Sequence, residues 1–346
     1  MVVINPGPET VAKYQRVQQK TLEEEKSLEQ LRGLPAATQD GRVFKLEANL
    51  DAPEELKPIA SLQADGIGLF RTEYLFLNRT TPPSEEEQTK AYGAVVKALD
   101  CPVVIRTADI GGDRLSQLGI EGPKSETNPF MGLRGVRLFL RHPDLFKTQL
   151  RSILRASLKG KVKLLIPMIS SVSELHAVRR LLSQATAELQ AEGVELAEKV
   201  DLGIMIEIPS AALIIDAFLP HLDFISIGTN DLIQYTLAVD RINEHVTHLY
   251  DPYHPAVIRL LDHVVQAARK KGKWVSVCGE MVSDPHAVPL LVGMGVDSLS
   301  VSPRMFLRVK QVLRGLRHAA MAKLVAKAVT CGDSEEIRRL MRDQGL

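Results

Sequence analysis

Residues 224–241 read FISIGTNDLIQYTLAVDR, an apolar, β-branched run that ends in Asn230 and Asp231. Four further segments repeat this pattern of a short apolar run followed by a reactive side chain: IGLFRTE (67–73), VVIRTADIGGD (103–113), IMIEIPSAA (204–212) and WVSVCGEM (274–281). In barrels of parallel strands, chemistry is carried by the loops at the carboxyl ends of the strands. The side chains that end these five runs are therefore expected to share one face.

The pattern of strands and helices indicates the fold class. Short β-like runs lie near 43–50, 66–71, 102–107, 161–169, 202–208, 224–228, 274–278 and 298–301, and helical periodicity occurs at 133–158, 173–193, 209–219, 254–271 and 286–293. Eight strand–helix units in roughly 270 residues fit a TIM barrel. The rival is a doubly wound open sheet, but neither GxGxxG nor GxxxxGK[ST] follows a strand here. We predict an α/β fold, a (β/α)8 TIM barrel.

Both ends of the chain carry helices outside the predicted barrel. Residues 8–32 read as a helix that starts at Pro8, stops before Gly33, and is too polar in its middle to be core. Polar helices are predicted at 319–328 and 334–343. The expected organisation is a linker helix and lead-in (1–40), the barrel (41–317) and C-terminal capping helices (318–346).

The composition is that of an average globular protein. The chain has 346 residues, 45% hydrophobic and 25% charged, with a formal charge of +1. This charge gives no reason to expect nucleic acid as a partner, and no apolar stretch is long enough for membrane insertion. The first ten residues, MVVINPGPET, lack the features of a signal peptide. Three cysteines without CxxC spacing fit a reducing compartment, so a cytoplasmic protein is expected.

Four arginines follow the predicted strands or lie in loops between them. Arg71 and Arg106 end the second and third strands, Arg134 lies in NPFMGLRGVR, and Arg241 ends LAVDR. Guanidinium groups bind phosphate and carboxylate bidentately, and several in one pocket repel one another until an anion neutralises them. A ligand with more than one negative charge is predicted. Surface ion pairing is the alternative, and it remains competitive for Arg134.

Two acids end neighbouring strands. Glu207 and Asp231 follow the fifth and sixth runs, so their carboxylates are expected to reach one ion. Carboxylates that share a cation with substrate phosphates suit Mg²⁺, with Mn²⁺ as the near substitute. The alternative for Asp231 is a cap on the next helix. Asn230 adds a neutral donor for phosphate oxygens.

Cys278 is a thiol at the end of the seventh run. An unperturbed cysteine has a pKa of about 8.5 and is mostly protonated at neutral pH, so Cys278 can give a proton to a carbon. A nucleophile and a buried small hydrophobe are the alternatives. Arginines, two carboxylates that share one metal ion, and a proton donor together suit phosphoenolpyruvate (PEP). The metal ion stabilises the enolate of PEP, and the methylene carbon takes the proton.

These residues carry a family resemblance. GIGLFRTEYLFL, RTADIGGD, NPFMGLRGVR, MIEIPSAA, FISIGTNDLIQYTLAVDR and GKWVSVCGEM resemble the PEP-binding barrel of enzyme I of the bacterial phosphotransferase system, the phosphoenolpyruvate–protein phosphotransferase family, over about residues 3–315. The resemblance implies that Arg71, Arg106 and Arg241 bind the phosphate, with Arg241 also near the carboxylate. It also implies Arg134 near the enolate oxygen, Glu207 and Asp231 on Mg²⁺, Asn230 on phosphate, Cys278 as proton donor, and a homodimer formed through the barrel.

The chain departs from that family in two ways. Glu207-Ile208-Pro209 and Gly111-Gly112-Asp113-Arg114 stand where relatives usually have ETP and GGDK. The swivelling phosphohistidine domain and the helical domain that docks the phosphocarrier HPr are not found. We expect a C-terminal fragment or a stand-alone barrel that donates phosphoryl to a histidine elsewhere. The alternatives are a PEP synthase or pyruvate phosphate dikinase type of domain, a carbon–carbon lyase acting on PEP or pyruvate, and a PEP-sensing or dimerisation module.

Overall fold

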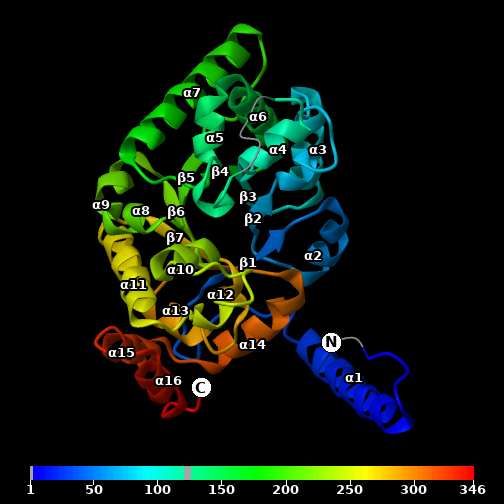
Figure 1. Ribbon diagram of the computed structural model, residues 1–346, viewed down its shortest axis with the longest axis vertical. Helices are drawn as coiled ribbons and strands as arrows, with labels where there is room; N and C mark the ends of the chain where they lie inside the picture. Colours follow the sequence, from blue (N-terminus) through cyan, green and yellow to red (C-terminus); the bar gives the residue numbers. More distant parts are fainter. Residues whose placement is uncertain (1–2, 121–125) are drawn as a thin grey trace.

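A closed barrel of parallel strands forms the centre of the molecule (Figure 1). The computed structural model describes residues 3–120 and 126–346. Within these residues eight strands follow one another around the ring, and β1 pairs with β8 to close it. They are β1 (Lys45–Leu50), β2 (Ile67–Arg71), β3 (Val103–Arg106), β4 (Val162–Ile166), β5 (Asp201–Ile206), β6 (Phe224–Gly228), β7 (Trp274–Cys278) and β8 (Ser298–Val301). The predicted (β/α)8 TIM barrel is confirmed, and each predicted run corresponds to one strand.

Helices follow the strands and form the outer layer (Figure 1). After β1 and β2 come α2 (Leu56–Leu62) and α3 (Glu85–Ala98), and after β3 come α4 (Gly112–Gln117), α5 (Val136–Arg141) and α6 (Pro143–Ala156). After β4, β5 and β6 come α7 (Val172–Ala191), α8 (Pro209–Leu213), α9 (Ile215–Phe218), α10 (Thr229–Leu237) and α11 (Pro255–Lys270). After β7 and β8 come α12 (Glu280–Ser283), α13 (Val288–Met294) and α14 (Phe306–Gly315).

Two helical segments predicted as continuous are each divided. The 133–158 segment becomes α5 and α6, because Pro143 disfavours helical backbone at His142, which adopts φ −123° and ψ 70°. The 209–219 segment becomes α8 and α9, with Ile214 at φ −110° and ψ 30° between them.

The interior of the barrel is filled, partly with apolar and partly with polar side chains. One buried apolar cluster comes from the inward faces of β2 to β7: Leu69, Val104, Leu165, Met205, Phe224 and Cys278. On the side of β1 and β8, hydroxyls bond to one another and to amides, as where Ser300 donates to Asn49 at 2.6 Å. Since side chains occupy the middle of the barrel, a ligand is expected at its mouth.

The terminal helices lie outside the ring. In Figure 1, α1 (Pro8–Glu29) projects away from the barrel, and it ends three residues before the predicted limit. At the other end, α15 (His318–Ala328) packs against α13, and α16 (Ser334–Arg342) follows it.

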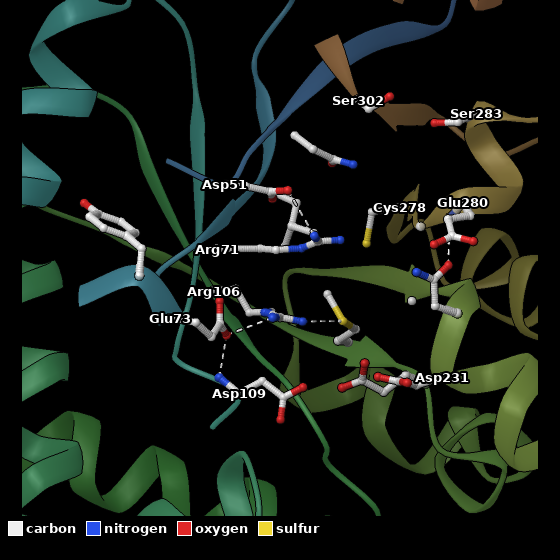
Figure 2. Close-up of a pocket in the computed structure, with 18 of the residues that line it drawn as sticks. Asp51, Arg71, Glu73, Arg106, Asp109, Asp231, Cys278, Glu280, Ser283 and Ser302 are labelled. Atoms are coloured by element: carbon white, nitrogen blue, oxygen red, sulfur yellow. Dashed lines mark hydrogen bonds and ion pairs between the residues drawn. The ribbon is translucent and has the colours of Figure 1, made fainter. Parts of the chain in front are cut away.

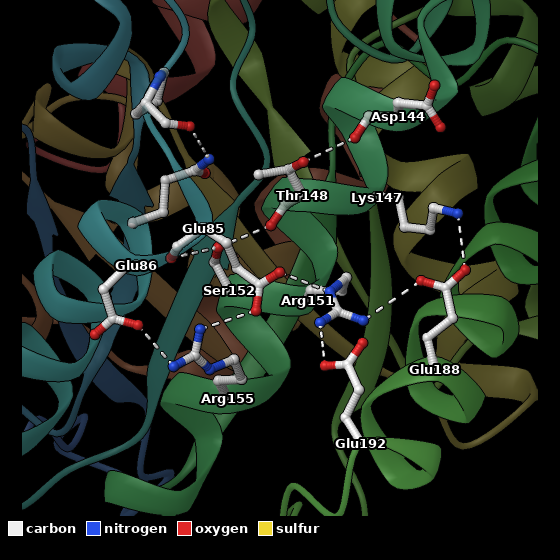
Figure 3. A network of polar contacts seen from close by, with 12 residues as sticks. Glu85, Glu86, Asp144, Lys147, Thr148, Arg151, Ser152, Arg155, Glu188 and Glu192 are labelled. Carbon is white, nitrogen blue, oxygen red and sulfur yellow. Dashed lines mark hydrogen bonds and ion pairs between the residues drawn. The ribbon is translucent and has the colours of Figure 1, made fainter.

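Ion pairs join three of the outer helices (Figure 3). Arg151 on α6 lies 2.6 Å from Glu85 on α3 and 2.6 Å from Glu192 just after α7. Arg155 lies 2.9 Å from Glu85, and Lys147 lies 2.8 Å from Glu188. This network holds α3, α6 and α7 together on the side of the barrel that carries β2 to β4.

Candidate active site

A cavity of about 640 Å³ opens at the carboxyl ends of the strands. Every residue singled out from the sequence lines it: Arg71, Arg106, Arg134, Glu207, Asn230, Asp231, Arg241 and Cys278. Figure 2 shows several of them converging from strands on opposite sides of the barrel. The structure therefore brings the whole predicted set into one cavity, while the role of each residue stays a prediction.

Two arginines end neighbouring strands, and acids hold both. Arg71 Nη1 lies 3.2 Å from Asp51 Oδ2, and both side chains are accessible to solvent. Arg106 is buried, and its Nη2 donates to Glu73 Oε1 at 2.8 Å (Figure 2). Burial disfavours the charged guanidinium, but Glu73 and other nearby acids outweigh that cost and hold the pKa of Arg106 above its ordinary value. Arg106 thus stays charged inside the cavity.

Arg134 reaches the same cavity from a loop distant in sequence. A bridge between Gly111 and Arg134 brings the loop back against the end of β3. Arg134 Nε and Nη2 donate to the two carboxylate oxygens of Asp109 at 3.0 and 2.6 Å, a bidentate pair. Arg134 Nη2 also lies 3.9 Å from Asp231 Oδ2. Arg134 is therefore paired with an acid, as the alternative held, but the pair lies in the cavity wall and not on the surface.

Glu207 and Asp231 lie side by side at the ends of β5 and β6. Glu207 Oε1 accepts the Met168 N–H at 2.6 Å, whereas Asp231 Oδ1 is buried with no hydrogen-bond partner among the described residues. Burial, and then the nearby charges of Asp231 and Asp109, raise the pKa of Glu207 to about 8. Two like charges at this depth favour either a proton or a cation between them.

The start of α10 shapes another wall of the cavity. Asn230 Oδ1 accepts the backbone N–H of Glu280 at 2.7 Å, which links β6 to β7 at their carboxyl ends. Gly279 joins the end of β7 to Glu280 and has φ +115°. A Cβ at this position would come within 2.4 Å of Thr229 Oγ1. Only glycine allows this approach. Arg241 Nη2 lies 3.8 Å from Asp231 Oδ1, on the same wall.

Cys278 is buried in the cavity wall. Its Sγ lies 3.4 Å from Ser226 Oγ and 3.6 Å from the carbonyl oxygen of Ile227. Burial raises the pKa of the thiol above its ordinary value, although the Ser226 hydrogen bond and the nearby charges of Arg106 and Arg71 oppose this rise. The thiol therefore keeps its proton at neutral pH.

Sequence reasoning missed the acids that pair with the arginines. Glu73 and Asp109 follow Arg71 and Arg106 by two and three residues, within segments already recognised as strand ends. Asp51 and Glu280 also line the cavity. Their signal was position, because each comes one to three residues after the end of a strand.

Buried atoms of both arginine and aspartate side chains lack hydrogen-bond partners among the described residues, and they indicate what the cavity can bind. Among the described residues, buried atoms without a hydrogen-bond partner include Arg106 Nε, Arg241 Nε and Asp231 Oδ1. Buried polar groups normally have partners, so two free guanidinium donors and a free carboxylate oxygen call for a ligand. The described residues hold no group of three or more His, Cys, Asp or Glu that would bind a metal alone. A cation held here would need further oxygen ligands from water or from a bound molecule.

Comparisons of the sequence with protein families and with curated proteins both match proteins that use PEP. The family described as "PEP-utilising enzyme, PEP-binding domain" matches residues 25–318. Phosphoenolpyruvate-protein phosphotransferase of Staphylococcus carnosus is 43% identical over 343 residues, which are 99% of this chain and 60% of that protein. The protein of the same name from Listeria innocua is 42% identical, over 98% of this chain and 59% of that protein.

The chain thus spans about three fifths of these two relatives. A crystal structure of a citrate lyase from Burkholderia xenovorans is similar at 14% identity and a TM-score of 0.47, covering 91% of this chain and 95% of that chain. So weak a likeness supports no functional inference. No helix in the described parts of the chain is long and apolar enough to span a membrane.

Proposed function

Because the chain belongs to the PEP-utilising enzyme family through that family's PEP-binding domain, we propose that it is the catalytic barrel of a phosphoenolpyruvate–protein phosphotransferase. The observation that carries the proposal is the cavity itself. It collects four arginines, two neighbouring carboxylates and a protonated thiol around buried polar atoms that have no hydrogen-bond partner among the described residues. PEP has a phosphate, a carboxylate and an enol carbon that match these three kinds of group.

The donor set fits Mg²⁺ shared with the substrate. In the part of the chain that the structure describes, Asp231 Oδ1 has no hydrogen-bond partner, and nearby Glu207 has a pKa raised to about 8 by burial and by neighbouring acids. A divalent cation removes both problems, and Mg²⁺ usually takes one or two protein carboxylates together with substrate oxygens. Glu207 and Asp231 would hold Mg²⁺, or Mn²⁺ in its place, and the bound ion would supply positive charge to the developing enolate.

The arginines orient and neutralise the substrate. Arg71, Arg106 and Arg241 bind the phosphate, with Asn230 as a neutral donor to the same group. Arg134 donates to both oxygens of Asp109, which fixes its guanidinium, and it would contact the enolate oxygen. When the bond between phosphorus and the enol oxygen breaks, phosphorus bonds to a histidine nitrogen, and the electron pair stays on the enolate.

Cys278 completes the reaction. Its S–H proton goes to the methylene carbon of the enolate, which becomes the methyl group of pyruvate. The thiolate that remains recovers a proton from solvent. This role is supported by the raised pKa of the thiol and by its burial in the cavity wall.

The acceptor and carrier belong to other polypeptide segments. We infer a phosphohistidine domain, in cis or in trans, that receives the phosphoryl group and passes it to an HPr-type phosphocarrier in the cytoplasm. We also infer a homodimer formed through the barrel. Exposed apolar side chains on elements near the cavity mouth support it: Met131, Leu213, Ile214, Ile242 and Leu249.

Calorimetric titration with PEP and Mg²⁺ tests the proposal. The chain should bind PEP only when Mg²⁺ is present, and Arg106→Met should abolish binding. Arg79→Met is the matched control, because Arg79 pairs with Glu87 away from the cavity. No binding by the wild type at millimolar PEP would refute the proposal, and cleavage of a 2-oxo acid to pyruvate by this chain alone would favour a lyase.

A further inference from the structure

A buried glutamine on α6 contacts the strand ends that carry the cavity. Gln149 is fully buried, and its side chain lies behind β2 and β3 rather than in the cavity. Its Nε2 donates to Thr72 Oγ1 at 3.1 Å and to Tyr92 OH at 2.9 Å. Its Oε1 accepts the backbone N–H of Ala108 at 3.1 Å. Every polar atom of the amide is therefore used.

The direction of each hydrogen bond in this network is determined. Thr72 has one hydroxyl hydrogen, which it donates to the carbonyl oxygen of Arg106 at 2.8 Å, so it must accept from Gln149. Tyr92 likewise donates its single hydrogen to Gln88 Oε1 at 2.9 Å and accepts from Gln149. Burial raises the pKa of Tyr92 well above its ordinary value, so this hydrogen stays in place.

The network holds the backbone that leads out of Arg106. Thr72 bonds to the carbonyl of Arg106 itself, and Gln149 bonds to the amide two residues later, at Ala108. Glu73, next to Thr72, then accepts from the Arg106 guanidinium at 2.8 Å and from the Asp109 amide at 2.5 Å. A shift of Gln149 would therefore move both the backbone of Arg106 and the acid that holds its side chain.

Gln149 has one structural role, because it satisfies the buried amide of Ala108, which a leucine could not do. The placement of its hydrogen bonds points to a second role. Gln149 makes two of its three hydrogen bonds to Ala108 and Thr72, which lie next to Arg106 in the fold. It does so from a helix that the outer ion pairs of Arg151 and Arg155 also hold (Figure 3).

We propose that Gln149 is a positioning residue that, through Thr72 and Ala108, sets Arg106 at the distance and angle at which it binds a phosphate. The inference rests on the proposed function, in which Arg106 holds the phosphate of PEP. It predicts an effect confined to ligands that carry that group. Pyruvate, which lacks the phosphate, should be bound almost as well without Gln149 as with it.

The test compares two buried glutamines of the same network. Gln149→Leu leaves the Ala108 amide buried without a partner and frees the hydroxyl of Thr72, whereas Gln88→Leu removes an equally buried amide that bonds to Tyr92 and Pro83. With Mg²⁺ present, Gln149→Leu should weaken PEP binding about tenfold, the effect of misplacing one charge-assisted hydrogen bond, and pyruvate binding by less than about twofold. Gln88→Leu should lower the melting temperature similarly and leave both affinities near wild type.

A second pair of variants keeps the test decisive if Gln149→Leu does not fold. Thr72→Val removes the hydroxyl with little change in shape and should also weaken PEP binding selectively, whereas Thr72→Ser restores the hydroxyl and should rescue it. Equal losses for PEP and pyruvate, equal effects of Gln149→Leu and Gln88→Leu, or wild-type PEP affinity in Thr72→Val would each overturn the inference. Failure of the wild type to bind PEP would instead remove the proposed function, and this inference with it.

Discussion

Replacing Glu207 by glutamine should make the metal-free protein more stable at alkaline pH. Glu207 is 1% exposed, and its pKa rises from 4.5 to about 8 because of burial and the nearby charges of Asp231 and Asp109. Between these two values the native state binds more protons than the unfolded state, so the stability of the wild type falls as pH rises through this window. Below the unfolded pKa, Glu207 is neutral in both states and nothing is lost.

The magnitude follows from the size of the shift. Each pKa unit corresponds to about 1.4 kcal/mol, so a shift from 4.5 to about 8 corresponds to at most roughly 5 kcal/mol of stability lost by about pH 9. Glu207→Gln removes the charge and keeps an oxygen that can accept the Met168 N–H. The free energy of unfolding of the variant should therefore exceed that of the wild type by several kcal/mol at about pH 9 and by little at about pH 5.

Urea unfolding followed by circular dichroism, in a series of buffers with a chelator, measures this difference. Glu195→Gln is the matched control, because Glu195 is exposed outside the cavity, and it should show no such pH-dependent gain. Adding Mg²⁺ should stabilise the wild type but not Glu207→Gln, since only the former has both carboxylates. A stability difference that does not grow with pH would refute the reasoning about Glu207.

Three further changes have distinct expected results. Cys278→Ala should slow the exchange of the pyruvate methyl protons with D₂O, measured by NMR, by about 100-fold or more. PEP binding, measured by calorimetry, should persist. Exchange at the wild-type rate would exclude the thiol as proton donor. Gly279 has φ +115° and lies against Thr229, so Gly279→Ala should destabilise the protein by about 2–3 kcal/mol in urea unfolding. The control Gly193→Ala, at φ +73° with open space around it, should cost about 1 kcal/mol. Equal costs would contradict the steric argument. Arg151→Met should lower stability by about 1 kcal/mol at low salt and by less at 1 M NaCl, and a salt-independent loss would indicate that packing rather than ion pairing is responsible.

The ends of the strands were predictable because their signal is local. An apolar, β-branched run that stops at Arg71, Arg106, Glu207 or Cys278 shows both the strand and the residue that follows it. Once eight such runs are counted, parallel closure places all these ends at one mouth. The arginines, Glu207, Asn230, Asp231 and Cys278 of the cavity could therefore be named from the sequence, although the acids that pair with the arginines were missed.

The partners of those residues were not predictable in the same way. Asp109 pairs bidentately with Arg134 across 25 positions, and Gln149 bonds to Thr72 across 77 positions. No short-range pattern records such contacts, because they exist only once the barrel has closed and α6 has packed behind β3. The division of 133–158 at Pro143 was a local signal that helical periodicity concealed.

The sequence by itself determined which chemical groups this protein carries to the mouth of its barrel, because strand period and strand ends are properties of neighbouring residues. Only the tertiary structure decided how those groups are charged and held. The raised pKa of Glu207 and the fixed position of Arg106 both arise from burial beside groups distant in the chain. Electrostatic energy and hydrogen-bond geometry depend on distance in space, and the order of residues does not contain that distance.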